Sequence, residues 1–134
     1  MNFKRKNKNG YTTIQLAAKK GHLGVLKQLI EAGADINIKD NKGRSALMEA
    51  SMRGHEDVVR ELVRQKANIN DTDNMKRSAL VLSTAMDHID VSKALIQFSA
   101  EVDQKDKKGR SALIFAAKNG NIDLVRNLIQ VGAS

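Results

Sequence analysis

Apolar residues along this chain recur at helical spacing, and the same pattern returns every 33 residues. The second copy is the clearest, because Val58, Val59, Leu62 and Val63 form one apolar stripe among polar neighbours. Stripes at the same phase are Val25, Leu26, Leu29, Ile30, then Val91, Leu95, Ile96, then Leu124, Val125, Leu128, Ile129. Each stripe predicts a short helix with one buried face.

A shorter helical pattern precedes each stripe. In the second copy, Ser45 is a suitable N-cap for a helix that begins at Ala46. Gly54 ends that helix, since glycine tolerates the left-handed conformation at this position. Glu56 and Asp57 begin the next helix, where negative charge is favourable for the helix dipole. Each copy therefore predicts a pair of helices.

The period itself predicts a stack rather than one globular core. Asp40, Asp73 and Asp106 open three copies, and a more diverged copy opens at Asn7. Isolated helices shorter than about 12–15 residues are marginal in water, so the apolar faces must be buried against neighbouring copies. We expect one all-α domain over residues 1–134, with repeats at approximately 7–39, 40–72, 73–105 and 106–134.

The segments 40–47, 54–55 and 67–70 resemble the ankyrin repeat. The resemblance covers almost the whole chain. It implies a solenoid of stacked antiparallel helix pairs, linked by β-hairpin-like loops, that serves as a non-enzymatic protein–protein interaction module. The proline and histidine of the family's Thr-Pro-Leu-His signature are missing, and we expect the missing histidine to weaken the polar tie between neighbouring turns. Those two slots hold Thr13/Gln15, Ala46/Met48, Ala79/Val81 and Ala112/Ile114.

The repeat register continues into both ends of the chain. Residues 1–6 resemble the tail of a preceding repeat or an N-terminal extension, because Phe3 has the phase of Ile36 and Met1 has the phase of Ala34. The last copy keeps an apolar stripe, whereas terminal repeats normally carry a polar outer face. We expect a piece of a longer array, and a natural four-repeat protein with irregular caps stays open as the alternative.

Charge adds a candidate surface. The formal net charge is +8. The resemblance implies an inner, concave surface made by the hairpin tips and the late part of each first helix. The residues that this register assigns to partner binding are Lys8, Tyr11, Lys19, Lys20, Lys42, Arg44, Met52, Arg53, Met75, Arg77, Met86, Lys107, Lys108, Arg110 and Lys118. The basic residues predict binding of an acidic protein segment, although a merely solvated face stays open. Tyrosine and the methionines are interface anchors in one interpretation and packing between copies in the other.

Two other functions remain open at this point. Positive charge also suits a nucleic acid or another polyanion. Nucleic-acid binding is less favoured because few aromatic residues are available for base stacking and no base-reading motif is present. The third interpretation is an architectural spacer within a larger array.

Catalytic and metal chemistry find no support in the sequence. There is no cysteine, no glycine-rich dinucleotide motif and no phosphate-binding loop. His22, His55 and His88 share one phase, but packed helices stand about 8–10 Å apart. Zinc ligands lie only about 2 Å from the metal, so the three cannot share one ion. We expect no enzymatic activity, cofactor or metal, and an intracellular, cytoplasmic monomer, with a nuclear location also open.

The third copy departs most from the pattern. Lys76, Asp87 and Ser99 replace turn glycines, and Ser83, Thr84 and Ser92 replace mostly small or apolar residues. Non-glycine residues at positive φ cost about 1 kcal/mol each. The third copy is therefore predicted to be the weakest internal repeat. Drift and a specialised surface both remain open as its cause.

Overall fold

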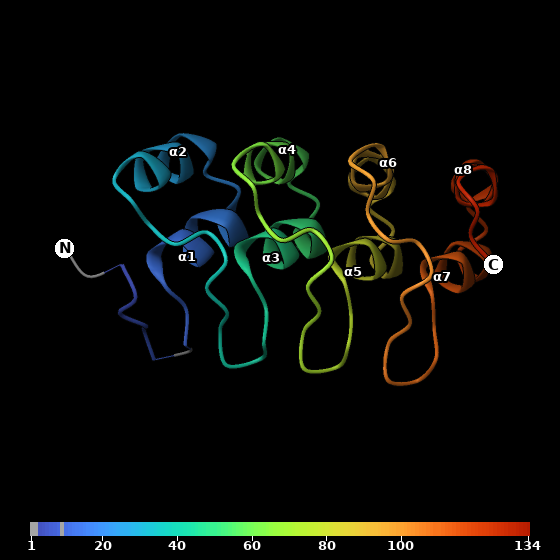
Figure 1. Cartoon of the computed structure of the whole chain (residues 1–134), viewed down its shortest axis with the longest axis horizontal. Coiled ribbons are helices and arrows are strands. Elements are labelled where there is room, and N and C mark those ends of the chain that lie inside the picture. Colours follow the sequence, from blue (N-terminus) through green and yellow to red (C-terminus); the bar gives the residue numbers. More distant parts are fainter. Residues whose placement is uncertain (1–2, 9) are drawn as a thin grey trace.

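A computed structural model describes residues 3–8 and 10–134, and this part of the chain contains eight helices in four antiparallel pairs (Figure 1). The helices are α1 (Thr13–Lys20), α2 (Leu23–Glu31), α3 (Ala46–Arg53), α4 (Glu56–Arg64), α5 (Ala79–Ala85), α6 (Ile89–Gln97), α7 (Ala112–Lys118) and α8 (Ile122–Gln130). The first helices of the pairs form one row, the second helices form another, and the two termini lie at opposite ends. The all-α stack expected from the sequence is confirmed.

The predicted capping residues begin and end the helices. The Oγ atom of Ser45 accepts a hydrogen bond from the backbone N–H of Met48 at 3.3 Å, and Ser78 and Ser111 make the equivalent bonds. Gly54 ends α3 with φ 79°. These local signals set the length of each first helix, so that its apolar side faces the stack.

The core runs the whole length of the stack. The stripe residues Val58, Val59 and Leu62 are completely buried, as are Leu124 and Leu128 in the fourth repeat. Phe3 packs against this core as a partly buried residue. Ile36, Ile69 and Val102, which share its phase, do the same. Met1 lies outside the described residues.

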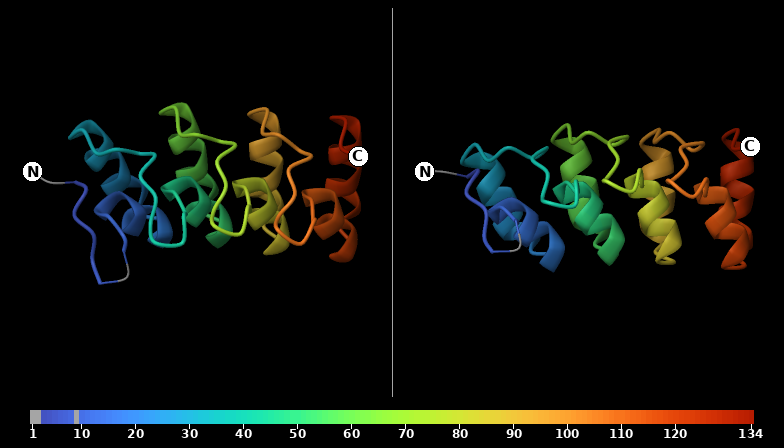
Figure 2. Two further views of the ribbon diagram at one scale, coloured as in Figure 1. Left: turned by 60° about the horizontal axis from the view of Figure 1, so that its bottom comes forward. Right: turned by 90° about the horizontal axis from the view of Figure 1, so that it is seen from below.

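The hairpins project side by side from the first-helix row (Figure 2). Within one hairpin, the backbone N–H of Asp73 donates to the carbonyl of Arg77 at 3.0 Å. Neighbouring hairpins are also joined: the N–H of Asn74 donates to the carbonyl of Lys42, and that of Lys107 donates to Met75, both at 3.0 Å. These bonds join the second repeat to the third and the third to the fourth outside the helical core.

The expected loss of polar ties between turns is wrong for the first repeat. Gln15 occupies the histidine slot of the family signature and is completely buried. Its Nε2 atom donates to the carbonyls of Ile38 at 3.0 Å and Arg44 at 2.9 Å, both next to the following hairpin. A glutamine amide has two N–H donors, so it can bridge two carbonyls and replace the missing tie.

The glycine replacements of the third repeat take the predicted strained conformations. Lys76, Asp87 and Ser99 have φ values of 59°, 65° and 66°, and Lys66 in the second repeat has 73°. Each lies in the left-handed region that disfavours side chains with a Cβ atom. The sequence therefore located the three strained positions of the third repeat correctly.

The other departures of the third repeat form one buried cluster. The Oγ atom of Ser92 lies 2.7 Å from Ser83 Oγ and 2.9 Å from Thr84 Oγ1. Ser83 and Thr84 also donate to the carbonyl of Leu80. Ser92 follows on α6, and the other two hydroxyls lie on α5, so the cluster joins both helices of this repeat. The three polar replacements satisfy one another, as buried hydroxyls require.

Candidate functional site

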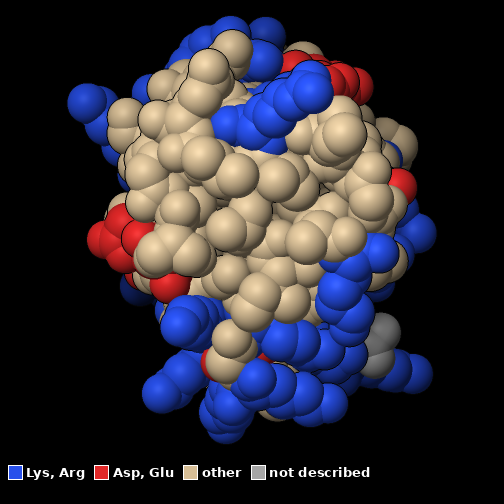
Figure 3. All heavy atoms as spheres, turned by 90° about the vertical axis from the view of Figure 1, so that its right-hand side faces the viewer, with Lys and Arg blue, Asp and Glu red and all other residues tan. Residues whose placement is uncertain are grey.

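We use the name hairpin face for the surface made by the four hairpins and the last turns of α1, α3, α5 and α7. Lysine and arginine side chains gather at the hairpin side of the molecule when it is viewed along the stack (Figure 3). The sequence-predicted cations that are exposed here are Lys8, Lys20, Lys42, Arg53, Lys107, Lys108 and Lys118. Further exposed cations of the hairpins were not among the predicted site residues: Lys4, Arg5, Lys6, Lys76 and Lys105. Their position beside the predicted tips was the signal that could have found them.

Two of the predicted arginines are held inside the hairpins. The Nε atom of Arg77 lies 2.9 Å from Asp73 Oδ2, and that of Arg110 lies 2.8 Å from Asp106 Oδ2. The aspartate side chains are almost completely buried. Each arginine therefore supplies the opposite charge that a buried carboxylate requires. These arginines brace the base of a hairpin and present only part of their charge to a partner.

The carboxylate of Asp106 is held by several hydrogen bonds within the fourth hairpin. Its Oδ1 atom accepts the backbone N–H groups of Lys108 and Arg110, each at 2.9 Å. Burial acts to raise the pKa of the Asp106 carboxyl, but the hydrogen bonds from Arg110 and Lys108 outweigh it and lower the pKa. The ionised aspartate is therefore a structural part of the fourth hairpin.

Arg44 differs from the other two because it lies between carboxylates of two elements. Its Nη1 atom is 3.8 Å from Glu49 Oε1, and its Nε atom is 3.8 Å from Asp73 Oδ2 of the next repeat. On the other side of Glu49, the Nε atom of Arg53 lies 3.9 Å from Oε2. The side chain of Arg44 is only 12% exposed, so Arg44 links the second and third repeats beneath the hairpin face.

Glu49 is the site residue that sequence reasoning missed. It is completely buried in α3, and neither carboxylate oxygen has a hydrogen-bond partner among the described residues. Burial raises the pKa of the Glu49 carboxyl, while the neighbouring Arg44 lowers it by less. The signal was present in the sequence, because the same phase holds Leu16, Leu82 and Phe115 in the other copies.

The predicted anchors differ in their exposure. Tyr11 is buried, with 8% of its surface exposed, and Lys19 Nζ lies 4.6 Å from the centre of its ring. Met52 is half-buried. Met75 and Met86, by contrast, are 42% and 55% exposed and both belong to the third repeat. The third repeat thus contributes two exposed methionines to the hairpin face, whereas the tyrosine of the first repeat is buried.

The remaining features do not assemble a catalytic site in the described part of the chain. His22, His55 and His88 stand at the starts of second helices. No group of three or more histidine, aspartate or glutamate residues is arranged there to hold a metal. Nor does any helix among the described residues have the length and apolar character needed to cross a membrane.

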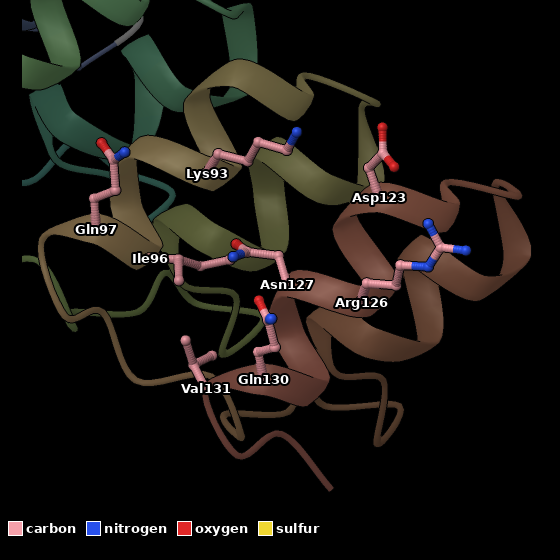
Figure 4. A pocket seen from close by; sticks show the side chains of 8 residues that line it. All are labelled: Lys93, Ile96, Gln97, Asp123, Arg126, Asn127, Gln130 and Val131. Carbon is pink, nitrogen blue, oxygen red and sulfur yellow. The ribbon is translucent and has the colours of Figure 1, made fainter.

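A groove of about 550 Å³ lies between the second helices α6 and α8 (Figure 4). Lys93 and Ile96 line it from α6, and Asp123, Arg126 and Asn127 line it from α8. Its charges have both signs and no nucleophile with an adjacent base is present among the lining residues. We therefore place the candidate site on the hairpin face.

The stacked helix pairs and joined hairpins define a solenoid repeat protein, whose accessible surface extends along one side. A family model described as ankyrin repeats (3 copies) matches residues 1–73 and again 66–134. The chain belongs to the ankyrin repeat family. That description counts three copies, whereas the described residues form four helix pairs. The comparison with curated proteins gave no match. Ankyrin repeats are generally protein–protein interaction modules and typically act as non-enzymatic scaffolds.

Proposed function

We propose that this chain is a non-enzymatic interaction module that binds an acidic protein segment along the hairpin face. The observation that carries the proposal is the arrangement of exposed side chains from repeat to repeat. Met75 and Met86 on the third repeat lie between exposed cations of the second repeat and those of the fourth. A segment with acidic residues on both sides of an apolar side chain would match this surface.

The two exposed methionines supply apolar contact area, which the charged side chains alone do not provide. Exposed ion pairs contribute little affinity, whereas apolar side chains near the centre of an interface contribute most of it. Methionine adapts to irregular partners because its side chain is unbranched and polarizable. The exposed lysines around it would raise the association rate and make binding sensitive to salt.

The burial of the aromatic residues makes a nucleic acid the weaker alternative as a partner. Binding of single strands depends on aromatic side chains on which bases stack. All four aromatic residues lie in the described part of the chain, where Tyr11 is buried and Phe3, Phe98 and Phe115 are half-buried. An architectural spacer remains the third interpretation, and it requires no binding at the hairpin face.

The first experiment uses labelled synthetic peptides of about fifteen residues, rich in glutamate, with and without a central leucine. Fluorescence anisotropy should show binding of the leucine peptide, weaker binding of the all-polar peptide, and a loss of affinity with added salt. Tighter binding of random single-stranded RNA or DNA than of either peptide would favour the polyanion function. No binding of any probe would favour the spacer.

Charge reversal tests the assigned face. The variant Lys42→Glu/Lys107→Glu/Lys108→Glu should weaken peptide binding at least tenfold, because all three side chains are exposed on the hairpin face. The matched control is Lys27→Glu/Arg64→Glu/Arg126→Glu, which makes the same change in net charge on exposed positions of second helices. Equal losses in the two variants would show a general charge effect and contradict the assigned face.

One chain supplies the whole hairpin face, so we propose that a single copy, a monomer, is sufficient to bind this partner. The intracellular setting, cytoplasmic or nuclear, is likewise part of the proposal. It is supported by the absence of cysteine, which makes the fold independent of disulfides.

A further inference from the structure

The two ends of the stack expose side chains at positions that are buried in every other repeat. At the α7–α8 end, Ile114 is 41% exposed, whereas the residues of the same phase, Gln15, Met48 and Val81, are at most 1% exposed. Ala117, whose counterparts Ala18, Ser51 and Thr84 are buried, is also exposed at this end. Ile129 is exposed as well, whereas its counterparts are buried or half-buried. The end-on view shows a broad, mainly uncharged central surface, with basic side chains across its upper part and along its lower edge (Figure 3). We call it the C-end face.

The opposite end has a matching surface. Val25 is 53% exposed, whereas Val58, Val91 and Leu124 at the same phase are at most 1% exposed. His22 is exposed too, although its counterparts His55 and His88 are half-buried. The surface formed by His22, Val25 and the half-buried Leu29 is the N-end face.

Inside the chain, these two faces meet at each junction between repeats. The ring of His55 lies over Gly21, so close that a Cβ atom there would be 2.7 Å from Nδ1. His88 lies over Gly54 in the same way, at 2.6 Å. Gly120 has the same phase, and no described atom lies within 4 Å of the corresponding position. The C-end face therefore keeps an open place for a histidine ring, and the exposed His22 is the residue of that phase.

We infer that the C-end face binds the N-end face of a second copy of this chain, head to tail. The occupant follows from continuity with the junctions between successive repeats, which already bury these positions against each other. In the assembly, His22 of the second copy covers Gly120, and Val25 and Ile114 leave the solvent. A head-to-tail contact does not close on itself, so it generates open chains of copies rather than a symmetric dimer.

Such stacking requires high concentration. Within one chain, covalent connection gives neighbouring repeats an effective concentration in the millimolar range or above, and a separate copy lacks this advantage. Separate copies must also lose translational and rotational freedom on association. Stacking leaves the hairpins accessible and places the hairpin faces of successive copies in one line, so it lengthens the binding surface of the proposed function without blocking it.

The test follows the mass of the protein by sedimentation velocity from about 10 μM to about 1 mM, the range in which an untethered junction should form. The wild type should grow from monomer to dimers and larger species. The variants Ile114→Glu and Val25→Glu each block one face, and each alone should stay monomeric. Glutamate is favourable at the third position of a helix, which both residues occupy, so the fold should be retained.

Mixing the two variants gives the decisive result. Ile114→Glu keeps an intact N-end face and Val25→Glu keeps an intact C-end face, so an equimolar mixture should form one-to-one dimers and nothing larger. Circular dichroism and urea unfolding verify that both variants are folded. The control Met86→Glu places the same charge at an exposed position in the third repeat and should assemble like the wild type.

Three results would overturn the inference. The first is a wild type that stays monomeric over the whole range. The second is unchanged growth of either end-face variant. The third is a mixture in which Val25→Glu forms dimers with itself while Ile114→Glu stays monomeric, because that pattern means that two C-end faces meet each other.

Discussion

The guanidinium of Arg44 lies 3.8 Å from the carboxylate of Glu49, which is completely buried in α3. The distance is too long for a hydrogen bond, and both carboxylate oxygens lack partners among the described residues. A buried ion pair stabilises a fold only when its geometry offsets the loss of hydration. We therefore expect Glu49 to reduce the stability of the second repeat.

Replacing Glu49 with leucine should stabilise the protein by about 1–3 kcal/mol at pH 7. Leucine stands at this phase in the first and third repeats, and Arg44 would keep Asp73 as its partner. Urea unfolding monitored by circular dichroism measures the change in the free energy of unfolding. A loss of several kcal/mol would show instead that Arg44 and Arg53 need this carboxylate.

The same pair predicts a dependence on pH. Because the pKa of Glu49 is raised above its ordinary value of 4.5, the folded state holds this proton more tightly than the unfolded state. Stability from this group is present below pH 4.5 and is lost as the pH rises through the folded pKa. The advantage of Glu49→Leu over the wild type should therefore be smaller at pH 4 than at pH 7. An advantage that does not change with pH would contradict the raised pKa.

In contrast to Glu49→Leu, the substitution Asp106→Asn should destabilise the protein, lowering its free energy of unfolding by about 1–3 kcal/mol at pH 7. The substitution weakens the hydrogen bonds from Lys108 and Arg110 and leaves the Arg110 guanidinium without its anion. The lowered pKa of Asp106 means that its contribution is present above the ordinary value of 3.8 and is lost as the pH falls through the folded pKa. The two proteins should therefore converge at acid pH. The control Asp123→Asn, at an exposed residue in the first turn of α8, should cost less than 1 kcal/mol.

The contrast between Glu49 and Asp106 separates what the sequence predicts from what it does not. Repetition made the turn aspartates, the capping serines and the apolar stripes predictable, because these features depend on residues a few positions apart. The choice of carboxylate by each arginine was not predictable in this way. Arg77 and Arg110 bind the aspartate of their own hairpin, whereas Arg44 lies beside Glu49 and the next hairpin.

Which carboxylate an arginine contacts depends on how neighbouring repeats pack together. Arg44, Arg77 and Arg110 occupy the same phase, and only the surrounding side chains distinguish the arginine that lies between two repeats from the two that brace their own hairpins. The division of the hairpin face into anchored arginines and exposed lysines therefore could not be read from the sequence. The same holds for Ser92, whose partners Ser83 and Thr84 are adjacent in space because α5 and α6 pack together.

The hydroxyl cluster of the third repeat predicts strong coupling between its members. Ser92→Val restores the residue type of Val59 but places a methyl group where Ser83 Oγ lies at 2.7 Å. It should cost about 1–3 kcal/mol, through overpacking and lost hydrogen bonds. The triple variant Ser83→Ala/Thr84→Ser/Ser92→Val, which matches the second repeat, should recover most of this loss. Additive costs in urea unfolding would mean that the cluster is not a coupled unit.

Two glycines allow backbone conformation to be tested separately from packing. Gly24 lies within α2 and Gly33 follows it with φ 97°, and at neither position would a Cβ atom meet a described atom within 4 Å. Gly24→Ala should stabilise by about 1 kcal/mol, since alanine is the better helix former. Gly33→Ala should destabilise: the left-handed conformation costs an alanine about 1–2 kcal/mol, of which the reduced entropy of the unfolded chain offsets about 0.4–1 kcal/mol. Thermal unfolding of the two variants should shift in opposite directions. Equal shifts would mean that φ does not decide the outcome, and the strain assigned to Lys66, Lys76 and Ser99 would then lose its basis.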